Sequence, residues 1–200
     1  MFPLGTVLFP GMFLPLHVFE ARYRALVDRC LAGTPEFGVV LIERGSEVGG
    51  GETRVDIGCV ARIVEAVQFE DGRWALGTVG VRRVAVERWL PDATYPAAEV
   101  VDLPDAPAGP VATSSRDRLV AACRRVLAMA AELGEATTAA TIDFADDPVA
   151  AGYQLAAAAP VGPLDKLALL AADTPDDRAE LLDRLLDDAA TVLAARVAGG

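Results

Sequence analysis

The chain has 200 residues, of which 52% are hydrophobic and 24% are charged, and this excludes a disordered tail and fits one large folded domain or two small ones. At this length roughly 70% of the surface of the unfolded chain can be buried, so the core needs neither disulfides nor a metal. Aspartate and glutamate outnumber lysine and arginine by 29 to 18, and the resulting net charge of −11 weighs against binding to nucleic acid or to an anionic membrane.

The apolar N-terminal segment predicts strands rather than a signal peptide or a membrane span. No lysine or arginine precedes Arg22, and the prolines and glycines of this segment would break a helix that crosses a membrane. Short apolar runs at 6–9 and 14–19 are typical of strands buried on both faces. The helical spacing of the next apolar residues predicts a helix over Ala21–Leu31, which Gly33 can end.

The rest of the first half predicts strands joined by turns. The pair Asp71-Gly72 supplies the positive φ angles that a tight hairpin demands between two long alternating segments. The glycine-rich stretch 46–52 predicts a flexible loop. One helix among several strands, with no repeating strand–helix–strand order, predicts a small, partly closed antiparallel sheet. These further strands are expected over 37–43, 57–69, 73–90 and 95–101.

Prolines at 104, 107 and 110 lack amide donors and predict an extended linker that is followed by helices. Ser114 or Ser115 is the expected N-cap of the first helix, and Thr174 is that of the last. Apolar residues form a stripe along the last helix, whose burial would contribute on the order of 10 kcal/mol before chain entropy is subtracted. The helices are expected over 116–133, 148–159, 163–172 and from 175 onward. The expected parts are a β-rich part at 1–103, the linker at 104–112 and a helical part at 113–200.

Few side chains are suited to catalysis or to metal binding. The one lysine, Lys166, does not follow a glycine as a phosphate-binding loop requires, and the one histidine, His17, is expected to be a hydrogen-bonded structural residue rather than a base or a ligand. The three cysteines are widely spaced, and no second histidine completes a zinc site. We therefore expect no ATPase or peptidase activity, no cofactor and no metal site, with buried thiols in a reducing, cytoplasmic setting.

Three motifs near the N-terminus carry a family resemblance. Residues 2–11 read FPLGTVLFPG, residues 14–20 read LPLHVFE, and residues 22–24 read RYR. These motifs resemble the amino-terminal substrate-binding domain of Lon proteases. In the helical part, Leu167 and Ala171 depart from the family's pattern. Further pieces that extend the likeness lie at 37–42, 58–63, 71–74 and 80–84, and more weakly at Asp165-Lys166 and Leu169-Leu170.

The resemblance implies an α+β fold, in which a PUA-like pseudobarrel with one helix precedes a C-terminal helical bundle. It also implies a free-standing, non-catalytic domain that binds unfolded or partly folded polypeptides, as an adaptor or accessory in protein quality control beside an ATP-dependent protease. The alternative is a PUA-like barrel that binds RNA or a small ligand. RNA binding would require Arg82, Arg83 and Arg88 to converge with Arg62 against the overall acidic charge.

Five apolar residues are the candidates for contacts with polypeptide. Met12, Phe13 and Leu14 lie between a glycine and a proline, where a turn is expected. Two interpretations stay open for this trio. It is either an adaptable hydrophobic handle for unfolded segments or a seal between the two parts of the chain. Trp89 and Tyr95, which are aromatic residues near strand ends, complete the set.

The remaining motif residues are expected to be structural. Phe2, Phe9 and Phe19 should fill the barrel, because large apolar side chains at strand positions are usually buried. Glu20 and Arg24 stand at the i to i+4 spacing of a helical ion pair. None of these residues is predicted to form a site.

Overall fold

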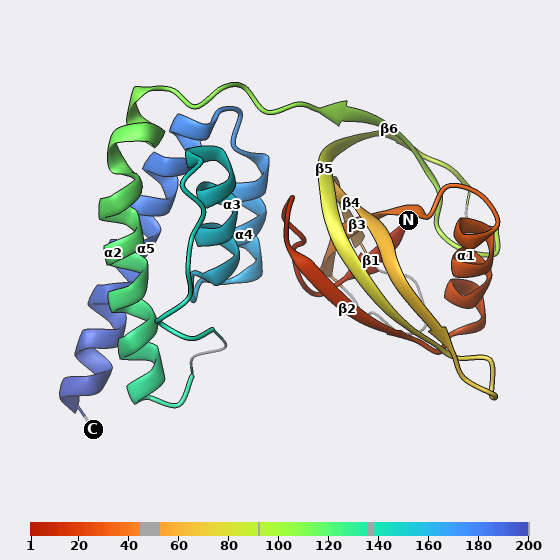
Figure 1. The fold of residues 1–200 in the computed structure, drawn as a ribbon, viewed down its shortest axis with the longest axis horizontal. Coiled ribbons are helices and arrows are strands. Elements are labelled where there is room, and N and C mark those ends of the chain that lie inside the picture. The colour runs from red at the N-terminus through yellow and green to blue at the C-terminus, as the bar shows by residue number, and fades with distance from the viewer. Residues whose placement is uncertain (45–52, 92, 136–137, 200) are drawn as a thin grey trace. The chain divides into compact units, whose positions relative to one another are not determined.

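Figure 1 shows a computed structural model of the chain, which describes residues 1–44, 53–91, 93–135 and 138–199. The chain divides into two compact units, Met1–Pro104 and Asp105–Gly200. None of the described helices combines the length and the apolar character that crossing a membrane requires. The predicted glycine-rich loop at 46–52 lies outside the described residues.

The described residues of the first unit form a six-stranded sheet and one helix. Its elements are β1 (Phe2–Leu4), β2 (Phe13–Val18), α1 (Ala21–Leu31), β3 (Glu36–Arg44), β4 (Thr53–Gln68), β5 (Trp74–Trp89) and β6 (Ala98–Leu103). β1 pairs with β3 in parallel, whereas the other pairs are antiparallel, so the prediction of an antiparallel sheet is wrong for β1. A parallel pair needs a long crossover, which β2 and α1 provide between β1 and β3.

The first strand lies earlier than predicted, because residues 6–9 form no strand. This segment is held instead by a turn against β5. The Gly11 amide donates to the Gly80 carbonyl at 2.8 Å, and a φ of 78° at Gly11 directs the chain into β2. A Cβ on Gly80 would come within 2.2 Å of the Phe9 carbonyl oxygen, so glycine is required where the two segments cross. Phe9 is buried, as predicted.

The predicted hairpin of β4 and β5 is confirmed. Gly72 has a φ of 79°, and the Phe69 amide donates to the Arg73 carbonyl at 2.9 Å. β5 pairs with β4 along one side. On its other side it pairs first with β2, through residues 74–79, and then with β6, through residues 83–89. Consequently β2 and β6 are edge strands of the described sheet, and so is β1, which pairs only with β3.

Helix α1 has the predicted bounds and buries its apolar face in the core of the first unit. Val27 is fully buried, and the ring of Tyr23 stacks on that of Phe2 with centroids 4.1 Å apart. Phe2 is buried, as predicted. This stacking ties α1 to β1, the strand at one end of the sheet.

The predicted ion pair between Glu20 and Arg24 is wrong. Glu20 is the N-cap residue of α1, and its carboxylate accepts from Arg22 Nε at 3.1 Å. Arg24 reaches the hairpin turn instead, where it donates to the carbonyl of Asp71 at 3.3 Å. The i to i+4 pairing fails because the cap residue has a non-helical backbone.

The second unit contains α2 (Pro110–Glu132), α3 (Pro148–Ala158), α4 (Pro163–Ala171) and α5 (Pro175–Gly199). α2 begins at Pro110, before the predicted start and inside the predicted linker, so the prediction of Ser114 or Ser115 as its N-cap is wrong. Its first amides are capped from α5, since the Asp176 carboxylate accepts from the backbone of residues 111 and 112 at 3.2 and 2.8 Å. Local sequence did not reveal a cap from another helix.

Helices α3 and α5 begin where they were predicted to begin, and α5 has its predicted cap. Asp147 caps α3 by accepting from the amide of Ala150 at 2.8 Å, and Thr174 caps α5 by accepting from the amide of Asp177 at 3.1 Å. The stripe of α5 is buried at positions such as Leu182, and α5 lies beside α2 (Figure 1). Sheet and helices together confirm the predicted α+β fold. Closure of the sheet as a PUA-like pseudobarrel and an independent helical bundle stay predictions.

Candidate functional site

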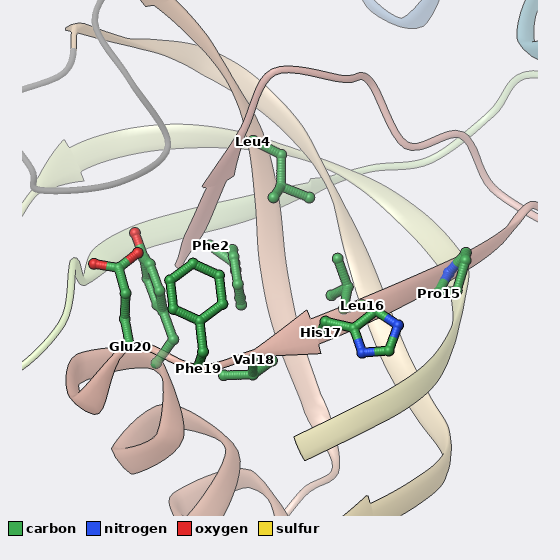
Figure 2. A pocket seen from close by; sticks show the side chains of 9 residues that line it. Phe2, Leu4, Pro15, Leu16, His17, Val18, Phe19 and Glu20 are labelled. Carbon is green, nitrogen blue, oxygen red and sulfur yellow. The ribbon is translucent and has the colours of Figure 1, made fainter. Parts of the chain in front are cut away.

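An apolar pocket of about 170 Å³ lies in the first unit between β1 and β2 (Figure 2). Leu16 extends from β2 toward Leu4 of β1. A cavity of about 150 Å³ in another protein binds benzene, so this pocket has room for about one ring-sized apolar side chain. Its lining consists of Phe2, Leu4, Pro15, Leu16, His17, Val18, Phe19, Glu20 and Tyr23.

The alternation of β2 determines which side chains reach the interior. Leu16 and Val18 turn toward the core, whereas Pro15 and His17 are exposed on the other face. Leu16 and Val18, the even-numbered residues of β2 that line the pocket, therefore supply apolar side chains to it, while His17, Glu20 and the buried Tyr23 also belong to its lining. This arrangement suits an apolar guest that enters from solvent.

In the described sheet β1 and β2 do not pair with each other, and each of these strands contains a proline. Pro3 in β1 and Pro15 in β2 have no amide hydrogen to donate. The Gly80 amide donates to the Met12 carbonyl at 2.9 Å, and antiparallel strands bond through every second residue. The backbone nitrogen of Pro15 therefore faces away from β5, toward the free edge of β2.

Two predictions for residues at the rim of the pocket, Phe19 and His17, are wrong. Phe19 was expected in the core but is 55% exposed, because it lies between the end of β2 and the start of α1. His17 is exposed, and its ring forms no hydrogen bond within the described residues, so it is not the predicted hydrogen-bonded residue. Beside them, the guanidinium of Arg22 lies 4.4 Å from the ring centroid of Tyr23 while it bonds to Glu20.

A family model described as the ATP-dependent protease La (LON) substrate-binding domain matches residues 1–188 of this chain. The chain belongs to the Lon substrate-binding domain family. A Lon protease of Roseiflexus castenholzii (strain DSM 13941 / HLO8) is 31% identical over 96 residues, which are 48% of this chain and 12% of that protein. The chain thus matches only a small part of the length of that curated relative.

Two solved structures are similar to this Lon-family chain. The Lon N-terminal domain protein from Xanthomonas campestris is 29% identical with a TM-score of 0.67, and the match covers 90% of this chain and 94% of that one. The N-terminal domain of Mycobacterium avium complex Lon protease is 20% identical with a TM-score of 0.63, covering 93% and 97%. The second likeness supports the fold alone.

The predicted trio of contact residues is divided between two faces of this Lon-family sheet. Phe13 is 62% exposed and lies over Gly77, where a Cβ would come within 3.2 Å of its ring. Met12 and Leu14 are partly buried and pack against the core. The strand alternation therefore leaves Phe13 alone of the three as a strongly exposed side chain. A role in polypeptide binding stays a prediction for all three.

Trp89 and Tyr95 lie apart from this trio. Trp89 ends β5, the strand whose opposite end pairs with β2, and its Nε1 donates to Asp56 Oδ1 at 3.0 Å. Tyr95 packs against the core and lines another pocket, of about 420 Å³, together with Met1. The five predicted residues therefore form no single site in the described chain. Sequence reasoning missed Leu16 and Phe2 as pocket residues, although the edge-strand prolines were a usable signal.

The reactive side chains of the domain are mostly buried. The three cysteines are free and buried, as predicted, and burial raises the pKa of Cys59 to about 12 and that of Cys123 to about 11. Lys166 is partly buried, which lowers its pKa, and its Nζ donates to the Ala157 carbonyl at 2.7 Å. Among the described residues, no group of three or more His, Cys, Asp or Glu is arranged to hold a metal ion.

The arginines considered for RNA binding face carboxylates. Arg62 and Arg82 both bond to Glu36, at 2.8 and 2.7 Å, and the bond from Arg82 is the main cause that lowers the pKa of Glu36. Arg88 bonds to a glutamate of β6 at 2.6 Å. Arg83 is buried, because adjacent residues of a strand face opposite sides. In the described part of the chain these charges give no support to RNA binding.

Proposed function

We propose that this Lon-family domain binds unfolded or partly folded polypeptide without cleaving it. The observation that carries the proposal is the apolar pocket between β1 and β2, in a chain of a substrate-binding family. Folded proteins bury most of their large apolar side chains, whereas unfolded chains expose them. A pocket that accepts one such side chain therefore selects non-native polypeptide without requiring a particular sequence.

Side-chain insertion explains the recognition better than the addition of a strand. A strand added beside β2 would lose the hydrogen bond that Pro15 cannot donate. Burial of one leucine or phenylalanine contributes about 1.5–3 kcal/mol, whereas micromolar affinity requires about 8 kcal/mol. A client must therefore make further contacts outside the pocket. Exposed aromatic surface at Phe19, on the rim, and at Phe13, on the outer face of β2, is available for them.

We further propose a non-catalytic role, in which the domain holds clients as an adaptor or accessory for an ATP-dependent protease. The exposed position of His17 and the bond of Lys166 to a backbone carbonyl support a role without acid–base chemistry. The buried free thiols support a reducing compartment such as the cytoplasm.

The test is a binding titration with the full chain and a fluorescently labelled polypeptide that is kept unfolded by reduction and carboxymethylation of its cysteines. We expect binding at micromolar protein. Phe19→Asp should weaken it by about tenfold, which is about 1.4 kcal/mol, because it places a charge where an apolar side chain enters. The matched control is Phe69→Asp, a similarly exposed aromatic that does not line the pocket and should change the affinity less than about twofold.

The outcomes distinguish binding in the pocket from nonspecific binding. Absence of binding at micromolar protein would overturn the proposed function. Equal weakening by the two aspartates would overturn the assignment to the pocket, because it would indicate that added negative charge alone is responsible. Circular dichroism of each variant confirms that both substitutions, at exposed positions, leave the fold unchanged.

A further inference from the structure

A second concave surface lies in the helical unit, beside the C-terminal half of α5. Its volume is about 690 Å³, within the range of roughly 300–1,000 Å³ for ligand pockets. Residues of α5 from Leu185 to Arg196 form one side, and the connection from α3 to α4 forms the other. Figure 1 shows the pair of α2 and α5 continuing past the ends of the shorter α3 and α4. We call this surface the α5 groove.

The residues of α5 that line the groove have the spacing of a helix-packing surface. Leu185, Ala189, Val192 and Arg196 all line it, and their spacing of four, three and four residues places them on one face of the helix. The stripe covers about three turns, roughly 16 Å. Val192 is 57% exposed, although the neighbouring Leu193 is buried. The stripe therefore has the pattern of a surface that packs against another helix, and in the described chain Val192 is exposed while Leu185 and Ala189 are half-buried.

Charges around the groove favour a basic occupant. Asp165 and Asp188 line it and form no ion pair within the described residues. Its two cations are engaged, because Arg196 is paired with Glu135 through bonds of 2.8 and 2.5 Å and Lys166 donates to a backbone carbonyl. Residues 105–200 as a whole contain fifteen Asp and Glu against eight Lys and Arg. A positively charged partner would be attracted to this unit.

We propose that the α5 groove binds an amphipathic helix with a basic polar face, presented by a partner protein. The apolar stripe of that helix would pack on Leu185, Ala189 and Val192, and its lysines or arginines would lie near Asp165 and Asp188. A second copy of this chain is the wrong occupant, because its net charge of −11 would oppose an acidic groove. The surface is separate from the β1–β2 pocket and does not rest on the function proposed for that pocket.

The test uses a labelled synthetic peptide of about 20 residues, with leucines on one helical stripe and lysines elsewhere, and the full chain as its binder. A counterpart peptide has glutamate in place of every lysine. We expect the basic peptide to bind and the acidic one to bind at least about tenfold more weakly. Val192→Arg should weaken the basic peptide by about tenfold, because it removes apolar contact and adds a like charge. The matched control, Ala194→Arg, adds the same charge on another face of α5 and should have an effect below about twofold.

Three results would overturn this proposal: no binding of the basic peptide, equal binding of the acidic one, or equal effects of the two arginine substitutions. A wild-type dimer that Val192→Arg dissociates in analytical ultracentrifugation would also overturn it, in favour of a second copy as the occupant. Phe19→Asp should leave the basic peptide unaffected, and Val192→Arg should leave the unfolded polypeptide unaffected. Failure at one surface is therefore distinguishable from failure at the other.

Discussion

Replacing Arg178 with methionine should destabilise the helical unit by about 3 kcal/mol. The side chain of Arg178 is only 1% exposed. Its Nε donates to the Leu169 carbonyl at 3.1 Å, and its Nη2 donates to the Tyr153 hydroxyl at 2.9 Å and to Asp105 at 3.3 Å. The guanidinium also lies 3.9 Å from the centroid of the Tyr153 ring. One side chain thus joins α3, α4 and α5 to the first residue of the unit.

The magnitude follows from what the substitution leaves behind. Removing one partner of a buried ion pair costs about 3–5 kcal/mol, because the other charge and the backbone acceptor lose their donor. Asp105 is 27% exposed and water can reach it, which places the expected cost at the lower end of that range. Methionine retains much of the side-chain volume, so the cavity contribution is small. Arg178→Lys keeps the charge but loses the planar fork, and its cost should lie between those of wild type and Arg178→Met.

The measurement is urea unfolding of the full chain followed by far-ultraviolet circular dichroism, which reports mainly the helices. Trp74 and Trp89 both lie in the first unit, so tryptophan fluorescence follows that unit separately. Asp105→Asn serves as the control, since an amide still accepts hydrogen bonds and should cost about 1 kcal/mol. A loss below about 1 kcal/mol for Arg178→Met would refute the reasoning, because it would mean that the buried contacts contribute no net stability.

Four further predictions concern Glu36, two glycines and the buried cysteines. Because the folded protein lowers the pKa of Glu36, its ion pairs stabilise the fold fully above the ordinary carboxyl pKa of about 4.3, and this stabilisation is lost as the pH falls through the lowered pKa. Glu36→Gln should therefore lower the free energy of unfolding by about 1 kcal/mol at pH 7, and urea titrations should show a smaller difference below about pH 4. Gly80→Ala should lower the free energy of unfolding by at least about 3 kcal/mol, because its Cβ would meet the Phe9 carbonyl at 2.2 Å. Gly152→Ala, inside α3 and with its nearest neighbour at 3.7 Å, should instead raise that free energy by about 0.5–1 kcal/mol, and a loss in thermal melts would contradict this. In the native protein the buried cysteines should resist iodoacetamide, and fast labelling of Cys59, detected by mass spectrometry, would disprove its burial.

Only part of the candidate site could be predicted from the sequence. The motif around β2 predicted the family and an apolar segment, and strand alternation alone indicates that Leu16 and Val18 share a face. The pocket exists because β1 pairs with β3 and leaves its other edge toward β2, and a parallel pairing across a long crossover has no local signal. The exposure of Phe19 likewise depends on where β2 ends and α1 begins.

By itself the sequence determined the elements whose causes are local. The hairpin turn at Gly72 and the starts of α3 and α5 depend on a few adjacent residues that restrict φ or cap an amide, and the bounds of α1 follow from the helical spacing of its apolar residues, so the signals for these features are local. Tertiary structure alone decided the features that depend on distant partners. The cap that Asp176 provides for α2 joins residues more than sixty positions apart, and so does the contact of Phe9 with Gly80. Such contacts form only after the elements pack, because their geometry is a property of the assembled unit and not of any segment.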